Sequence, residues 1–377
     1  MVSILSCSNF LSGELVKLPK VNTQNSLDSV QAEIVYKYAQ HFPNGTQLSF
    51  YILTHQKEKY IGVERRNDSL VYINNSDSTF EIGSITKPFT GILLSKLVYD
   101  GKVNPTEPIK NILHIPLKQS SLNGVEITLV HLANHTSGLP FEPSDVNDVK
   151  VPYTLNNRYD PYRNYTIERL YDYLSNKMIL QSTPGEKRIY SNLNFGLLGH
   201  ILTLLSEKSY ERQLFEVICN PLGMNNTYIT FNYERKHFLV QGRDEFGKPI
   251  PNGNIINNAF IGATGIKSSA KDLAKFIKAN IFDTTYFYLA QKTTKVTDEH
   301  FTGSLAWETY NEKGKHHVGA FGATGGYTSG LIFERNERVG VVVLSNVSAY
   351  LASKDSNIES LCKDLYGPLP YDTEKSK

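Results

Sequence analysis

The sequence predicts an α/β fold in which strand-forming segments at both ends of the chain enclose a largely helical middle. Paired strands are predicted at residues 47–54 and 59–63, and strand character returns at 305–310, 328–334 and 338–344. Between these regions, apolar residues recur at helical spacing. Strands from both ends around a helical middle indicate one sheet domain that is split by a helical insertion.

Several segments have the apolar spacing of helices. Residues 27–42 form the first, and Phe89, Ile92, Leu93 and Leu97 give a second helix an apolar stripe after residue 84. The remaining predicted helices cover residues 169–177, 195–207, 210–219, 270–281 and 349–365. We therefore expect a sheet domain over 23–104 plus 286–370 and a mostly helical domain over 105–285.

The composition excludes several classes of function. The chain has 377 residues, of which 40% are hydrophobic and 20% charged, and its net charge of +2 provides no electrostatic basis for binding nucleic acid. No apolar stretch approaches the ~20 residues that cross a bilayer. The three cysteines, Cys7, Cys219 and Cys362, lie far apart and predict neither a disulfide framework nor a zinc site.

Residues 1–22 are predicted to form a flexible leader. Ile4-Leu5-Ser6-Cys7 resembles the end of a bacterial lipoprotein signal, but the segment before it is short and has no basic lead. A cysteine in a disordered leader is the favoured interpretation. The alternative is a remnant of a signal or lipoprotein segment.

One short motif predicts a chemical function. Ser84 and Lys87 form a Ser-x-x-Lys pattern, and three residues apart on a helix they share one face. A neutral lysine amine could remove the hydroxyl proton and make the serine a nucleophile. The same pattern occurs at Ser268–Lys271 and Ser360–Lys363, so the tetrapeptide alone is weak evidence.

The surroundings of Ser84 distinguish it from the other two serines. Gly83 precedes it at the start of a predicted helix, where backbone N–H groups are free to support an oxyanion. The positive helix end also favours the neutral form of Lys87. Ser360 falls inside the last predicted helix and Ser268 precedes an ordinary amphipathic one, so we expect Ser84 to be the nucleophile.

Tyr190-Ser191-Asn192 is the second candidate element, between a Pro-Gly turn and a predicted helix. Tyr190 could relay protons between the nucleophile, Lys87 and the leaving group, and Asn192 could donate to a substrate carbonyl. Tyr-x-Asn also occurs at residues 72–74 and 162–164, so a chance surface tyrosine is the alternative.

The third element is the glycine-rich segment at residues 319–327, which is placed among the C-terminal strands. Gly322 allows another backbone to approach closely, as a bound peptide-like substrate requires. The Ala323 N–H could then be a second oxyanion donor beside that of Ser84. A plain glycine-rich hairpin is the alternative. No Gly-Lys-Ser/Thr follows, so a phosphate loop is excluded.

Taken in order, these motifs resemble the penicillin-recognising serine hydrolases, and most closely class C β-lactamases and their relatives among DD-peptidases and esterases. The resemblance runs from about residue 25 to 350. Besides the three elements above, it includes the segments at 129–140, 220–227, 262–273 and 341–346. It implies a β-lactamase/transpeptidase-like fold, with an antiparallel sheet flanked by helices and split by a mostly helical domain.

The resemblance also implies a mechanism. Ser84 would attack a carbonyl to form an acyl-enzyme, helped by Lys87 and Tyr190, without a metal or organic cofactor. The implied partner is a small-molecule or peptide substrate with an amide, β-lactam or ester carbonyl, and the implied location is periplasmic or envelope-associated. His131 and His135 lie four residues apart, but no glutamate follows His131, so a zinc site is not predicted.

The sequence departs from this family at one point. Relatives usually carry Lys-Thr-Gly or His-Thr-Gly where this chain has Ala320-Phe321-Gly322, so the cation and hydroxyl that grip a substrate carboxylate are missing. His316 and His317 lie just upstream. A charged hydrogen bond to a carboxylate contributes about 1.5–3 kcal/mol, so this loss could weaken binding by one to two decades.

Three functions follow from these observations. The first is a hydrolase of amides in cell-wall peptides or β-lactam-like compounds. The second is an esterase or acyltransferase of the same fold, with Phe321 as an apolar wall. The third is a catalytically silent binding protein, against which the intact set of Ser84, Lys87 and Tyr190 argues.

Overall fold

The structure is a computed structural model. It describes residues 22–24, 26–55, 57–67, 69–146, 159–230, 238–253, 258–296, 301–312, 315–348 and 357–369 of the chain. The predicted leader lies outside these residues, apart from residue 22.

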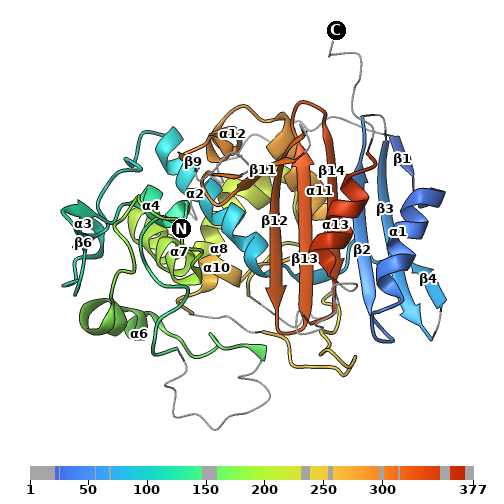
Figure 1. Cartoon of the computed structure of the whole chain (residues 1–377), viewed down its shortest axis with the longest axis horizontal. Helices are drawn as coiled ribbons and strands as arrows, with labels where there is room; N and C mark the ends of the chain where they lie inside the picture. Colours follow the sequence, from blue (N-terminus) through green and yellow to red (C-terminus); the bar gives the residue numbers. More distant parts are fainter. Residues whose placement is uncertain are drawn as a thin grey trace, which may run out of the picture.

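A large sheet occupies one half of the molecule (Figure 1). Within the described residues it has ten strands, and every pairing is antiparallel except that of β1 with β3. The path across the sheet is β1 (Asn22–Gln24), β3 (Lys57–Arg66), β2 (Gln47–Leu53), β14 (Val339–Ser345), β13 (Tyr327–Glu334), β12 (Lys315–Thr324), β11 (Glu308–Glu312), β10 (Phe301–Gly303) and β9 (Lys295–Val296), with β4 (Ser69–Ile73) paired to β3. Strands from the two ends of the chain therefore meet where β2 pairs with β14.

Helices cover both faces of the sheet. Helices α1 (Ser29–Ala39) and α13 (Ile358–Tyr366) lie side by side on one face, whereas α2 (Thr86–Tyr99) and α11 (Ala270–Phe282) lie on the other (Figure 1). Strand β14 is apolar up to its last residue, Ser345, because alternate residues enter the two cores: Val341 and Val343 face α1 and α13, and Val342 and Leu344 face the opposite core.

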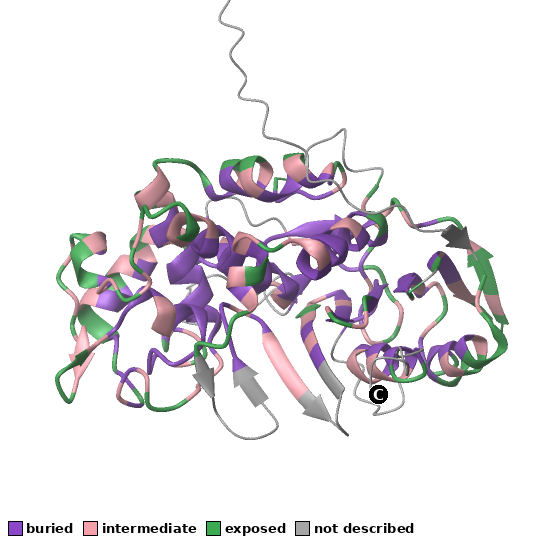
Figure 2. Cartoon of the chain, turned by 90° about the horizontal axis from the view of Figure 1, so that it is seen from above, coloured by how far each residue is buried: buried purple, intermediate pink, exposed green. Residues whose placement is uncertain are grey.

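Helix α2 is the central helix of the molecule, and its first turns are buried. The Phe89 ring stacks on Phe276 of α11 with a centroid distance of 3.9 Å, and Phe276 lies 5.9 Å from the Trp307 ring. These rings join the helical region to the sheet in one core. Figure 2 shows the buried residues concentrated in the sheet and the adjoining helices, with exposed residues outside.

In the sequence, the remaining helices lie mainly between the N-terminal and the C-terminal strands of the large sheet. They are α3 (Lys110–Leu113), α4 (Leu129–Ala133), α6 (Ile167–Asp172), η2 (Tyr173–Lys177), α7 (Asn192–Ser206), α8 (Tyr210–Leu214), η3 (Phe215–Cys219), α9 (Asn220–Leu222), α10 (Ile261–Thr264) and α12 (Tyr286–Gln291). The segments η2 and η3 are π-helical turns, so the predicted helices at 169–177 and 210–219 each continue an α-helix in wider form.

Two short strand pairs lie outside the large sheet. Strand β5 (Thr79–Glu81) pairs with β8 (Lys267–Ser269), and β6 (Ser121–Leu122) pairs with β7 (Val125–Glu126). The first pair matters for the site, because the chain leaves β5 directly into the turn that contains Ser84.

The predicted fold class is confirmed: an antiparallel sheet is flanked by helices. The strand predicted at 305–310 begins only at Glu308, because the chain turns sharply at Ala306, which has a φ of 71°. The last helix begins at Ile358, and residues 349–356 lie outside the described part. The division into two domains stays a prediction.

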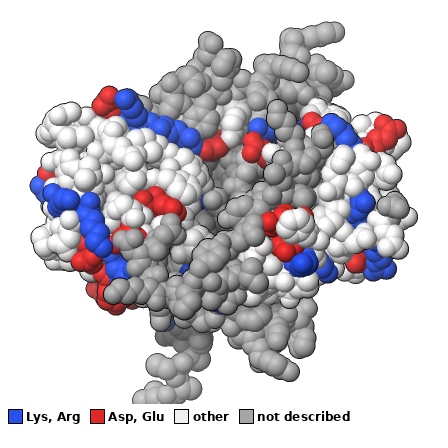
Figure 3. All heavy atoms as spheres, turned by 60° about the horizontal axis from the view of Figure 1, so that its bottom comes forward, with Lys and Arg blue, Asp and Glu red and all other residues white. Residues whose placement is uncertain are grey.

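The surface, the described helices and the cysteines add three observations. Lysine and arginine side chains are interspersed with aspartate and glutamate on the described part of the face in Figure 3, in keeping with the small net charge. Within the described residues, no helix combines the length and the apolar character that a membrane crossing requires. Cys219 and Cys362 are buried free thiols.

Candidate active site

Ser84 lies in a tight turn between β5 and α2. The turn, η1 (Gly83–Ile85), is a 3₁₀ helix that leads directly into α2 at Thr86. Gly83 has a φ of +50°, a conformation that side chains disfavour, so a glycine suits this position. Ser84 is half-buried and lines a pocket.

Lys87 stands one turn further, with its amine beside the serine. Its Nζ lies 2.7 Å from Ser84 Oγ and 2.8 Å from Asn192 Oδ1, and the side chain is buried. Burial lowers the pKa of Lys87, although interaction with Tyr190 opposes this shift. The direction agrees with the sequence prediction, but the main physical cause is burial of the amine rather than the helix terminus.

The other two Ser-x-x-Lys patterns have no such arrangement. Ser268 is buried and hydrogen-bonds to Thr227, while Lys271 extends to Asp77 at 3.1 Å. Lys363 extends to Glu359 at 2.8 Å. Of the three patterns, Ser84–Lys87 is therefore the one whose lysine lies beside its own serine.

Tyr190 borders the same pocket, and its chain neighbours, Ile189 and Ser191, both donate hydrogen bonds to His135. His135 accepts a hydrogen bond at Nδ1 from the Ser191 N–H, at 3.0 Å, and its ring lies 4.5 Å from the Tyr190 ring. Lys87 Nζ lies 4.9 Å from the centre of the Tyr190 ring. Burial, and then the charges of Arg188 and Lys87, hold the pKa of His135 well below its usual range. A neutral His135 is thus a structural support for Tyr190.

Asn192 begins α7, and its amide is occupied within the protein. Its Oδ1 accepts from Lys87, and its Nδ2 donates to the Tyr162 hydroxyl at 2.9 Å. The sequence suggested that Asn192 donates to a substrate carbonyl. That role stays a prediction, and the contacts add a second one, in which Asn192 holds the lysine amine in place.

Strand β12 passes directly beside the nucleophile turn. A Cβ on Gly322 would lie 2.0 Å from the Ile82 carbonyl oxygen, and a Cβ on Gly83 would lie 2.6 Å from the Ala323 nitrogen. Both backbones approach because neither residue has a side chain. The Ala323 N and O both face Gly83, so this amide lies on the side of the strand that carries Ser84.

The pocket in front of Ser84 has a volume of about 280 Å³. It is lined by residues from six separate segments of the chain: Ser84, Lys87, His135, Tyr190, Ala306, Glu308, Tyr310, Ala320, Phe321 and Glu359. In the described residues, β11 pairs only with residues 315–319 of β12. Among the described residues, β11 therefore leaves the edge at 320–324 unpaired beside the Ser84 turn.

Glu308, Tyr310 and Glu359 belong to the pocket but were missed by sequence reasoning. Alternation along a strand places Glu308 and Tyr310 on one face, so the predicted strand contained a usable signal. No local pattern connects α13 to this site. His317 is buried with its ring 5.3 Å from Tyr310, and it does not line the pocket; the side chain of His316 lies outside the described part.

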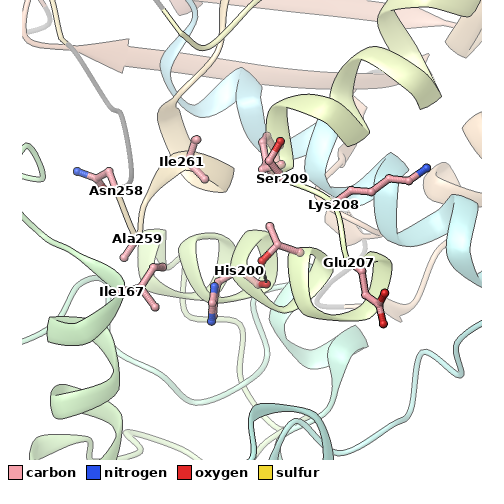
Figure 4. A pocket seen from close by; sticks show the side chains of 10 residues that line it. Ile167, His200, Glu207, Lys208, Ser209, Asn258, Ala259 and Ile261 are labelled. Atoms are coloured by element: carbon pink, nitrogen blue, oxygen red, sulfur yellow. Dashed lines mark hydrogen bonds between the residues drawn. The ribbon is translucent and has the colours of Figure 1, made fainter.

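A second pocket of about 290 Å³ lies beside α7 and α10 (Figure 4). Its polar side chains are engaged in local structure: Ser209 caps α8 by accepting from the Arg212 N–H, and His200 Nε2 lies 2.6 Å from the Tyr171 hydroxyl. Among the described residues, neither a lysine nor a histidine hydrogen-bonds to the Ser209 hydroxyl, in contrast to Ser84. Nor do the described residues contain three histidine, cysteine or acidic side chains grouped to hold a metal ion.

Comparisons with known proteins agree with this geometry. The chain is 27% identical over 283 residues to Protein flp of Staphylococcus aureus, covering 73% of this chain and 54% of that protein. It is 26% identical over 276 residues to a beta-lactamase of Providencia stuartii, covering 71% and 62% respectively. The chain thus spans little more than half the length of the curated relatives it matches.

A solved structure shows the same fold. The beta-lactamase/D-alanine carboxypeptidase from Pseudomonas syringae superposes with a TM-score of 0.71 at 22% identity, over 91% of this chain and 99% of that one. A family model described as Beta-lactamase matches residues 52–360, a span that contains the serine turn, the Tyr190 segment and strand β12. The chain belongs to the beta-lactamase family.

Proposed function

We propose that this protein is a serine hydrolase that forms an acyl-enzyme on Ser84 and acts on amide bonds of cell-wall-type peptides or β-lactam-like compounds. The observation that carries the proposal is the 2.7 Å contact between Lys87 Nζ and Ser84 Oγ at the base of an open pocket. The lowered pKa of the buried Lys87 increases the fraction of amine that can accept a proton.

In the proposed first step, neutral Lys87 takes the Ser84 proton as Oγ bonds to the substrate carbonyl carbon. The carbonyl π electrons move to its oxygen, which the N–H groups of Ser84 and Ala323 would stabilise. As the intermediate collapses, the C–N bond breaks and the leaving nitrogen takes a proton by way of Tyr190. A water molecule then hydrolyses the ester on Ser84 by the reverse use of the same groups.

The unpaired edge of β12 supports a peptide-like substrate. An extended backbone can form ladder hydrogen bonds with residues 320–324 and so align its carbonyl with Ser84. Two relatives reported above are a beta-lactamase and a beta-lactamase/D-alanine carboxypeptidase, which favours amides over the esterase alternative. Asn192 acts in this scheme as a positioning residue for Lys87.

Mass spectrometry tests the acyl-enzyme. We expect covalent labelling of Ser84 by a fluorophosphonate, an activated short-chain ester and a β-lactam, with loss of labelling in Ser84→Ala. Ser360→Ala is the matched control, because it alters the same sequence pattern at a serine of α13 and should label normally. A folded protein that takes no adduct from any reagent would be a binding protein and not an enzyme.

We further propose that the protein works in the periplasm or cell envelope, where peptides of the cell wall and β-lactams are encountered. The family resemblance supports this location. Cell fractionation with antibodies to the native chain tests it, and recovery in the cytoplasmic fraction alone contradicts it. The cysteine of the suggested lipoprotein signal, Cys7, lies outside the described residues.

A further inference from the structure

The end of the pocket beyond Ala320 has a different chemical character from the carboxylate-binding site that the family resemblance implies. Ala320 and Phe321 provide neither a cation nor a hydroxyl there. Two carboxylates, Glu308 from β11 and Glu359 from α13, line the pocket instead. Among the described residues that line the pocket, Lys87 is the only lysine or arginine.

Each of the two carboxylates is paired with a cation inside the protein. Arg188 donates to Glu308, and Lys363 donates to Glu359 at 2.8 Å. Arg188 and Lys363 do not line the pocket, whereas their acidic partners do. The Tyr310 hydroxyl also donates to Glu308, so the carboxylates enter the pocket lining with their partners already bound.

Aromatic rings complete this end of the pocket. Phe321 and Tyr310 both line it, and the Lys363 ammonium already lies 5.5 and 5.3 Å from their ring centres. Aromatic faces attract ammonium groups, and a carboxylate beside them adds a charged partner. Glu308 lines the same pocket as Ser84 and Lys87.

We infer that Glu308 and Glu359 determine specificity, and that the preferred substrates carry an ammonium group where substrates of the relatives carry a carboxylate. This inference rests on the proposed acyl-enzyme function. A substrate carboxylate would face two glutamates whose paired cations are already engaged, whereas an ammonium could share the glutamate oxygens with Arg188 and Lys363 beside the rings of Phe321 and Tyr310. The substrate class is therefore amides and esters whose leaving group ends in a cation.

Three thioesters of N-acetyl-D-alanine test the inference on the native enzyme. Their leaving thiols are thiocholine, 3-mercaptopropionate and 2-mercaptoethanol, which are cationic, anionic and neutral, and released thiol is measured colorimetrically. We expect kcat/KM for the thiocholine ester to exceed that for the mercaptopropionate ester by about tenfold or more at low salt. The ratio should fall as ionic strength rises, because the glutamates are partly exposed.

Substitution of the glutamates gives the sharper measurement. Glu308→Gln leaves the Arg188 charge unbalanced beside the pocket, so the preference should move toward the anionic ester by about tenfold. Glu359→Gln should act in the same direction through Lys363. Glu216→Gln is the matched control, since Glu216 is also paired with a lysine and an arginine but does not line this pocket.

The neutral thioester distinguishes the proposed acyl-enzyme function from the inferred preference for a cationic leaving group. Its hydrolysis, abolished in Ser84→Ala, reports the acyl-enzyme function alone. If the neutral ester is cleaved but the anionic ester is preferred, or if Glu308→Gln and Glu359→Gln leave the ratio unchanged, the inference is wrong while the function stands. If none of the three esters is cleaved, both the proposed function and the inference fail.

Discussion

At the scale of single residues, the chemistry of the pocket depends on the protonation of Lys87. Burial of the amine lowers the pKa of Lys87, and interaction with Tyr190 opposes that shift. The amine also lies next to the neutral amide oxygen of Asn192. A neutral hydrogen-bond partner can hold the amine without stabilising its charge as a carboxylate would. An asparagine at position 192 therefore favours the neutral form of Lys87, which can accept a proton.

We expect Asn192→Asp to impair the enzyme by changing the pKa of Lys87. A carboxylate 2.8 Å from Nζ stabilises the ammonium form, so the pKa of Lys87 rises and neutral amine becomes scarce near pH 7. The acidic limb of the kcat/KM profile should move to higher pH by about one unit or more. Asn176→Asp, on the surface beside Asp172, is the control. An unmoved limb would contradict this role of Asn192.

The raised pKa of Asp160 predicts that the stability of the protein depends on pH. Burial, and then the Glu81 charge, raise the pKa of Asp160 from 3.8 to about 6. A carboxyl group with a raised pKa contributes to the free energy of unfolding in its protonated form. This contribution is complete below pH 3.8 and is lost as pH rises through about 6, because the folded protein must then hold a buried charge.

Asp160→Asn removes this titration. Relative to the wild type, its free energy of unfolding should be higher at pH 8 than at pH 4 by up to about 3 kcal/mol. Urea unfolding at both pH values measures the difference. If the variant loses equal stability at both, Asp160 does not titrate in this way.

At the scale of elements, the site depends on the close approach of two backbone segments, the η1 turn and strand β12. The η1 turn presents Ser84, and β12 passes beside it through Gly322 and Ala323. Their close spacing requires the absence of side chains at Gly83 and Gly322, and Ser329 of β13 adds a hydrogen bond to the Ile82 carbonyl at 2.9 Å. The oxyanion geometry proposed above is therefore sensitive to a single added carbon.

Gly322→Ala should displace β12 from the nucleophile. The new Cβ would meet the Ile82 carbonyl oxygen at 2.0 Å, and neither group is a flexible side chain end. We expect kcat/KM to fall by about 10²-fold, with a loss of stability of about 1–3 kcal/mol. In the control, Gly367→Ala, the nearest atom to the new Cβ is 3.5 Å away, and activity should be unchanged. Wild-type kinetics in Gly322→Ala would show that the strand does not shape the site.

At the scale of the whole molecule, one core connects the helices with the sheet. Phe89 of α2, Phe276 of α11 and Phe333 of β13 are all buried in it, together with Trp307. Trp307 lies 5.2 Å from Phe333 and is the chain's single tryptophan. Helix α2, which carries Lys87, is thus fixed to the same interior as the strands that form the pocket.

This continuity predicts cooperative unfolding across the predicted domain division. Trp307 fluorescence reports the junction of helices and sheet, while far-UV circular dichroism reports all regular structure. We expect the two probes to give coincident midpoints in urea, because the helical part and the sheet bury shared surface. Separate transitions would instead show that the helical part unfolds on its own.

The sequence by itself determined the local elements of this protein. Apolar periodicity predicted the strands at both chain ends and most helices, and the motifs around Ser84 and Tyr190 indicated the reaction class. These features are local, since spacing along a strand or helix dictates which side chains share a face. The loss of the family's carboxylate anchor could also be read directly from Ala320 and Phe321.

Only the tertiary structure decided the electrostatics of the site. Asn192 contacts an amine 105 positions away, and Glu308 and Glu359 reach the pocket from elements more than 200 residues beyond Ser84. Burial of Lys87, not its helix position, is the main cause of its lowered pKa. Such effects depend on which distant groups share a low-dielectric space, and no local spacing encodes that. The Ser84–Lys87 pair follows from the sequence, whereas the charge of the pocket around it follows from the fold.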